Sequence, residues 1–154
     1  MTDFYVECET GLVTLLQTLT TFFPHDWQVS DDDTNIMKGA EYFVIVRPGA
    51  FPYFRRTEQL STIGWNVTID LYVSYKEYKQ SWNKFKAVRS AIFNLLMESP
   101  TLNDTLGVIR VDLTGDEQAQ YLKFSEAPEA KPNFIVQTMR AIVTQYIQHS
   151  SSEF

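Results

Sequence analysis

The strongest hydrophobic pattern in the chain is a strict alternation over residues 63–75. Apolar side chains occupy every second position of this segment: Ile63, Trp65, Val67, Ile69, Leu71, Val73 and Tyr75. The positions between them are mostly polar: Gly64, Asn66, Thr68, Asp70, Tyr72 and Ser74. A period of two is typical of a β-strand that buries one face. We therefore predict a strand here, with its polar face open to solvent.

Two segments have apolar residues at spacings of three and four, which is typical of amphipathic helices. In residues 4–23 the apolar stripe comprises Leu12, Leu15, Leu16, Leu19, Phe22 and Phe23. Pro24 is expected to end this helix, because proline cannot continue the hydrogen-bond ladder. In residues 76–98 the stripe comprises Tyr78, Trp82, Phe85, Val88, Ile92, Leu95 and Leu96. This second helix follows the alternating strand directly, so we expect it to fold back over the sheet.

Shorter apolar segments predict the rest of a sheet. Residues 42–46 are apolar throughout, as expected of a strand that is covered on both faces. The apolar phase of a last strand slips near residues 138–141, which indicates a bulge or bend. The other expected features are strands at 27–29, 108–113, 121–124 and 133–147, a turn at 115–117 and a polar connector at 125–132.

Together these elements predict a single α+β domain over residues 1–148, followed by a flexible tail at 149–154. Two amphipathic helices are expected to pack on a mostly antiparallel or mixed sheet. Hydrophobic residues make up 44% of the chain and charged residues 21%, which is ordinary globular usage. No apolar run approaches the roughly 20 residues that span a bilayer, and the start of the chain does not resemble a signal peptide. We expect no membrane association.

Residues 47–62, with the sequence RPGAFPYFRRTEQLST, follow neither period. A loop of this length inside a compact domain is unusual and often functional. It is either a plain surface loop or an arm that packs on a neighbouring subunit, because aromatic residues are enriched at protein interfaces. In the second interpretation the candidate interface residues are Arg47, Phe51, Tyr53, Phe54, Arg55 and Arg56.

The sequence contains no recognisable catalytic constellation. His25 and His149 have no carboxylate or cysteine partner at metal-ligand spacing. Cys8, the only cysteine, lies in no nucleophile motif and is expected to be structural. The glycines form no phosphate-binding loop. We therefore predict a protein that is not an enzyme and binds no cofactor.

The acidic run Asp31-Asp32-Asp33 is the one segment that invites a metal interpretation. A calcium loop also needs glycine at its sixth position and glutamate at its twelfth, where this chain has Ile36 and Tyr42. The run is therefore expected to be a solvated turn. The net charge of −6 argues against a nucleic-acid-binding surface, because phosphate binding needs clustered lysine and arginine. An acidic chain can still line a channel through which DNA slides.

The order of these features is similar to that of a known family. A first helix ends near Pro24, a strand ends in Arg47-Pro48-Gly49, and a loop rich in tyrosine and arginine follows. The alternating strand carries Trp65, the second helix carries Trp82, and the strand Gln137-Thr138-Met139-Arg140 comes late. Over roughly residues 4–148 this layout resembles the tail terminator, or tail-completion, proteins of long-tailed bacteriophages. The resemblance is one of layout, because the family has no invariant binding signature.

The resemblance implies a structural virion protein, assembled in the host cytoplasm, that forms a ring, usually hexameric. The ring would sit at the head-proximal end of the tail tube, stop tube polymerisation and dock the head. Its partners would be other copies of itself, the tail tube protein and the head–tail connector, and DNA would pass through the lumen without specific binding. Acidic residues facing the lumen would repel DNA, and the candidates are Asp31, Asp32, Asp33, Asp116 and Glu117.

Two other interpretations remain open at this point. The first is another neck, connector or tail tube subunit of a phage. The second is a small-molecule binding domain, in which Tyr53, Phe54, Tyr72 and Tyr75 would line a pocket.

Overall fold

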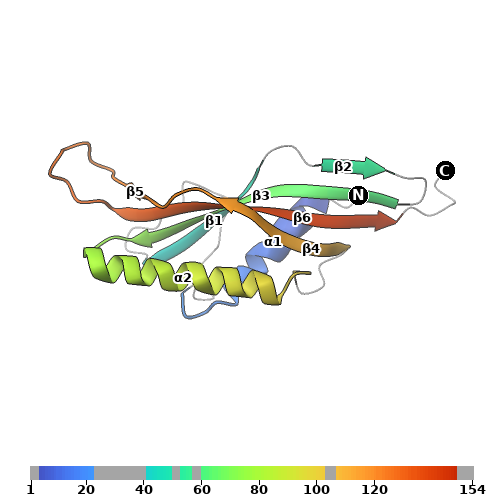
Figure 1. The fold of residues 1–154 in the computed structure, drawn as a ribbon, viewed down its shortest axis with the longest axis horizontal. Helices are drawn as coiled ribbons and strands as arrows, with labels where there is room; N and C mark the ends of the chain where they lie inside the picture. The colour runs from blue at the N-terminus through green and yellow to red at the C-terminus, as the bar shows by residue number, and fades with distance from the viewer. Residues whose placement is uncertain (1–3, 23–40, 50–52, 57–59, 103–106, 149–154) are drawn as a thin grey trace.

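Strand β3, Leu60–Ser74, is the centre of the fold and covers almost all of the predicted alternating strand. The computed structural model describes residues 4–22, 41–49, 53–56, 60–102 and 107–148. The other elements are α1 (Phe4–Gln17), β1 (Tyr42–Pro48), β2 (Tyr53–Arg56), α2 (Tyr78–Glu98), β4 (Val108–Asp116), β5 (Gln120–Leu122) and β6 (Phe134–Gln148). All strand pairs are antiparallel, in the order β1-β3-β6-β4, with β2 paired to β3 and β5 paired to β6 (Figure 1). The predicted α+β class is confirmed.

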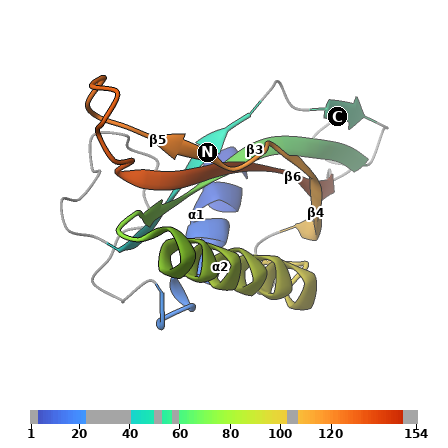
Figure 2. The same ribbon diagram turned by 60° about the vertical axis from the view of Figure 1, so that its left-hand side comes forward.

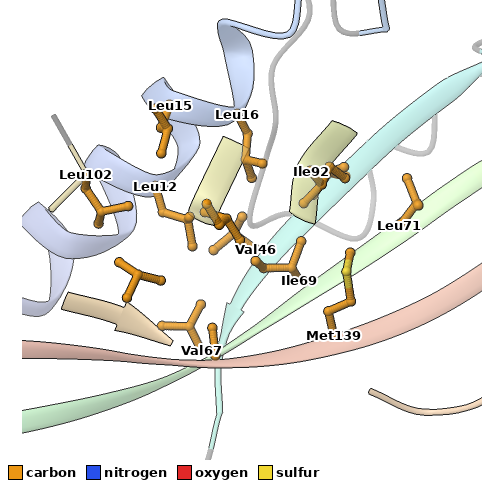
Figure 3. Close-up of a cluster of buried hydrophobic side chains, with 14 of the residues drawn as sticks. Leu12, Leu15, Leu16, Val46, Val67, Ile69, Leu71, Ile92, Leu102 and Met139 are labelled. Atoms are coloured by element: carbon orange, nitrogen blue, oxygen red, sulfur yellow. The ribbon is translucent and has the colours of Figure 1, made fainter. Parts of the chain in front are cut away.

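Both helices lie on the same face of this sheet, which the rotated view also shows (Figure 2). The core forms where leucines of α1 and Ile92 of α2 meet the odd-numbered side chains of β3, among them Ile69 and Leu71 (Figure 3). Each such buried side chain contributes about 1.5–3 kcal/mol relative to exposure. The apolar alternation of β3 thus fixes which face of the sheet the helices cover.

Helix α1 ends at Gln17, earlier than the predicted stop at Pro24. The Thr18 side chain donates a 2.6 Å hydrogen bond to the carbonyl of Leu15, and the Thr18 N–H bonds to the same carbonyl at 3.0 Å. A threonine that satisfies its own helix terminus in this way competes with further helix. The chain continues to residue 22 in turns, and Pro24 lies outside the described residues.

Helix α2 begins at Tyr78, two residues after the predicted start. Ser81 Oγ accepts hydrogen bonds from the N–H groups of Lys76 (2.9 Å) and Glu77 (3.2 Å), which hold the chain in the turn before the helix. The predicted stripe is correct at its centre, from Phe85 to Leu96, but Tyr78 is exposed.

The second face of β3 is not simply solvated, contrary to the prediction. Tyr72 stacks on Phe43 of β1 at 4.4 Å between ring centroids, and Phe134 of β6 meets both rings edge-on. These residues form a small second core with Ile45, against which Leu122 of β5 packs. The alternation correctly assigned the side chains of β3 to the two faces of the sheet. Residues of the neighbouring strands, however, cover part of the second face.

More than half of the predicted loop at 47–62 is in fact strand. β1 extends to Pro48, β2 pairs with β3 from Tyr53↔Gly64 to Arg56↔Ser61, and β3 itself begins at Leu60. A four-residue edge strand has too few positions to show a period, so only its pairing with β3 defines it.

The predicted bulge lies on the neighbouring strand. β6 pairs with β3 without a break, whereas β4 shifts its register against β6 between Leu113 and Gly115 and again between Val108 and Arg110. The apolar pattern of β6 is interrupted because the polar Gln137 occupies one of its buried, helix-facing positions. The predicted turn at 115–117 is wrong at its start, since Gly115 and Asp116 belong to β4. The predicted strand at 27–29 and the tail at 149–154 lie outside the described residues.

Candidate assembly surface

Strand β2 presents the most exposed part of the predicted interface. Phe54 is 57% exposed, and the side chains of Arg55 and Arg56 are exposed as well. Because Phe54 pairs with Ile63, it lies on the helix-covered face of the sheet, whereas Arg55 pairs with Thr62 on the other face. The backbone of Tyr53 pairs with Gly64, and Phe51 lies outside the described residues. An aromatic and two arginines therefore project from one edge of the sheet.

Arg47 lies on β1, farther along the same edge of the sheet, and its side chain binds within the chain. Its Nε lies 3.3 Å from Oδ2 of Asp70, on the face of the sheet away from the helices. Thr138 donates a 2.7 Å hydrogen bond to the other carboxylate oxygen, Oδ1. Asp70 is 9% exposed, so these two partners compensate a largely desolvated charge. The structure thus places Arg47 in a bridge between β1, β3 and β6.

The two acidic candidates at the end of β4 also have partners in the chain. Asp116 Oδ2 accepts a hydrogen bond from Nε2 of Gln137 at 3.1 Å. Glu117 Oε1 accepts one from Nη2 of Arg140 at 2.7 Å, and both side chains of this pair are more than half exposed. Asp31, Asp32 and Asp33 lie outside the described residues. Of the five acidic candidates the structure thus describes only Asp116 and Glu117, and both have partners in the chain.

A groove of about 420 Å³ separates α2 from β4. Its α2 wall is formed by Arg89, Ser90, Phe93 and Asn94, its β4 wall by residues 113–116, and Met139 of β6 also lines it. Phe93 is 48% exposed, and Met97, one helical turn beyond it, is 66% exposed. The guanidinium of Arg89 lies over the ring of Phe85 at 5.7 Å. The groove therefore combines an apolar wall with one positive and one negative side chain.

This groove was not among the predicted sites. The signal was present in α2, where Phe93 and Met97 fall outside the buried stripe and repeat at a spacing of four. A second apolar line on a helix that already buries one face indicates a further contact surface. The β4 wall had no comparable signal, because the bulge that shapes it appears only in the pairing with β6.

The aromatic residues proposed for a ligand pocket do not converge. Tyr53 and Phe54 pair with one end of β3, while Tyr72 lies near the other end. Tyr72 is stacked on Phe43, and Tyr75 packs edge-on against Tyr121. A smaller hollow of about 180 Å³ lies beside Tyr72 and Tyr121. The predicted four-residue pocket is therefore wrong.

Among the described residues, few side chains have catalytic potential. Cys8 is buried, and this burial, helped by the nearby charge of Glu7, raises the pKa of its thiol to about 12. Such a thiol stays protonated and is a poor nucleophile. Within the described ranges, histidine, cysteine and acidic residues form no group of three or more that could hold a metal ion. His25 and His149 lie outside those ranges.

Comparison with known proteins adds no relative: no model of a protein family matches the chain, and no curated protein matches it. Among the described residues, neither helix has the length and apolar character required to cross a membrane.

Proposed function

We propose that the chain is the tail terminator of a long-tailed bacteriophage. In this role it is a structural virion protein that forms a ring, by resemblance a hexamer, at the head-proximal end of the tail tube. The ring stops tube polymerisation and offers the docking surface for the head. Its partners are other copies of the chain, the tail tube protein and a connector protein of the neck.

The observation that carries the proposal is the layout of the fold. The resemblance implies a mixed domain with two helices on a sheet, and the described elements have that arrangement in the expected order. It also implies surfaces for neighbouring copies, and the chain exposes Phe54, Arg55 and Arg56 at one edge and Phe93 and Met97 near the other. Exposed large apolar side chains in lines or patches are typical of contact surfaces.

The charge of the chain supports the passage of DNA through such a ring. A net charge of −6 disfavours tight binding to phosphates, so DNA can slide past the protein. Asp31, Asp32, Asp33, Asp116 and Glu117 remain the candidates for the lumen. Asp116 and Glu117 are exposed residues at the end of β4; Asp116 is bonded to the neutral amide of Gln137 and keeps its charge, whereas Glu117 is paired with Arg140.

The test is deletion of the gene from a phage that carries it, followed by electron microscopy of the tails. Loss of a terminator gives tails of uncontrolled length, and complementation with the intact chain restores one length. Tails of normal length that fail to join heads would instead identify another neck or connector subunit. Absence of tail tubes would identify a tube subunit. Either of these two results rejects the terminator.

A further inference from the structure

The groove between α2 and β4 has the form of a site for an extended segment. β4 is the last strand of the sheet, and within the described residues no strand pairs with its outer edge. The free N–H and C=O groups of an edge strand can accept another strand, and a neighbouring groove then selects its side chains. Here the groove is walled by Phe93 and lies beside Met97, both exposed. An aromatic side chain suits this wall, because methionine and phenylalanine both pack well on rings.

Strand β2 of a second copy has the matching features. It is a short edge strand on the side of the sheet opposite β4, with β3 and β6 between them (Figure 1). Its Phe54 is exposed and lies on the helix-covered face, which is the face that carries the groove. The ring at one edge and the apolar wall at the other are therefore on the same face of the sheet.

Charge favours the same pairing. β2 adds two positive charges in four residues, whereas the whole chain has a net charge of −6. Asp116 lines the groove, and the exposed Glu98 lies on α2 one helical turn beyond Asn94, the last residue of α2 that lines it. Arg56 pairs with Ser61 and therefore shares the helix-covered face with Phe54, so it is the arginine of β2 that can approach these carboxylates; Arg89 lines the groove as well. A like-charged approach to Arg89 would be unfavourable.

We propose that β2 of one copy docks in the α2–β4 groove of the next copy, with Phe54 against Phe93 and Met97. Two different patches on opposite edges make a head-to-tail contact, which closes into a ring when the rotation per copy permits. This inference rests on the proposed function, because a ring-forming protein needs two such complementary surfaces.

Cross-linking between two cysteine variants tests the contact. Phe54→Cys and Phe93→Cys are prepared separately, mixed at high concentration or on purified tails, oxidised and run on a non-reducing gel. We expect a disulfide-linked heterodimer in the mixture, and ladders from the chain that carries both changes. The native Cys8 is buried and does not interfere. The matched control is Tyr78→Cys, which replaces an aromatic of α2 outside the groove that is even more exposed than Phe93 (66% against 48%).

The proposed contact would be overturned if Phe54→Cys cross-linked to Tyr78→Cys as strongly as it does to Phe93→Cys. Exclusive cross-linking of Phe54→Cys to itself would also overturn it, because that result indicates a symmetric dimer.

A second variant fills the groove without touching the core. Asn94→Trp changes an exposed residue that lines the groove, and Asn83→Trp makes the same change on α2 away from it. We expect Asn94→Trp to keep the circular dichroism and melting temperature of Asn83→Trp but to weaken self-association at least tenfold. Equal association of the two variants contradicts the docking. If rings form but Phe54→Cys and Phe93→Cys do not cross-link, the proposed contact is rejected and the proposed function is not. If deletion of the gene leaves tails of normal length, the proposed function is rejected.

Discussion

At the scale of single residues, Asp70 shows how distant strands change the role of a side chain. Its position in the alternation of β3 places it on the face away from the helices, as predicted. The sequence could not show that this face is partly covered, because the cover comes from Arg47 of β1 and Thr138 of β6. These residues lie 23 positions before and 68 positions after Asp70 in the chain. A carboxylate with 12% side-chain exposure depends on such partners.

Removing this carboxylate should therefore destabilise the protein. We expect Asp70→Ala to lower the free energy of unfolding by about 2 kcal/mol. The reason is that Arg47 and Thr138 both lose the carboxylate that accepts from them. The matched control is Asp112→Ala on the same face, whose pair with Arg110 is largely exposed. This control should lose less than about 0.5 kcal/mol. Urea unfolding of both variants checks the difference, and equal losses would show that Asp70 is not a structural charge.

The buried thiol of Cys8 makes stability depend on pH in the alkaline range. Its pKa is raised from 9.0 to about 12 in the folded chain, so unfolding releases a proton above pH 9. The stabilisation is complete below pH 9 and is lost as the pH rises toward 12. Between pH 8 and pH 10 the loss should be on the order of 1 kcal/mol. Urea unfolding at both pH values measures it, with Cys8→Ala as the control that removes this contribution. A wild-type pH dependence equal to that of Cys8→Ala contradicts the raised pKa.

At the scale of elements, the sequence predicted the helices and strands that are long enough to show a hydrophobic period. β3 and α2 carry enough consecutive positions to reveal periods of two and 3.6, and both were located to within a few residues. β2 was missed because its four residues are defined by hydrogen bonds to β3. The sequence predicted a bulge on β6, because the buried Gln137 disturbs the apolar pattern there. The irregular pairing does involve this part of β6, but the extra residues belong to β4. The groove beside β4 depends on that bulge and was missed with it.

Two glycines at the ends of β4 have opposite requirements. Gly107 has φ +71°, and a Cβ at this position would lie 2.6 Å from the carbonyl oxygen of Tyr146. Gly115 has open space at the same position. We expect Gly107→Ala to cost at least about 2 kcal/mol of unfolding free energy, because both the backbone conformation and the contact are unfavourable. Gly115→Ala should change it by less than about 0.5 kcal/mol.

Urea unfolding of the two alanine variants gives the comparison directly. Similar stabilities would mean that the start of β4 tolerates a side chain and that the close approach to β6 is not required.

At the scale of the whole molecule, the two edges of the sheet differ in a way that suits assembly. One edge ends in β2 with Phe54, Arg55 and Arg56, and the other ends in β4 beside the groove of α2. A chain with two different contact surfaces can form a ring of identical copies, and its acidic charge suits a ring that DNA must traverse. The sequence suggested this role through the resemblance and through the arginine- and aromatic-rich segment. It could not show which surface receives that segment, since the receiving surface forms only in the folded chain.

The most direct measurement is the length of tail tubes that polymerise in vitro with and without the purified chain. The tube protein of the same phage is allowed to grow, the chain is added at increasing concentrations, and tubes are imaged by electron microscopy. We expect growth to stop when the chain is added, with a ring visible at one end of each tube. Asn94→Trp should fail to stop growth at concentrations where Asn83→Trp succeeds. Tubes that keep growing with the intact chain, and that carry no ring at either end, would contradict the proposed terminator function.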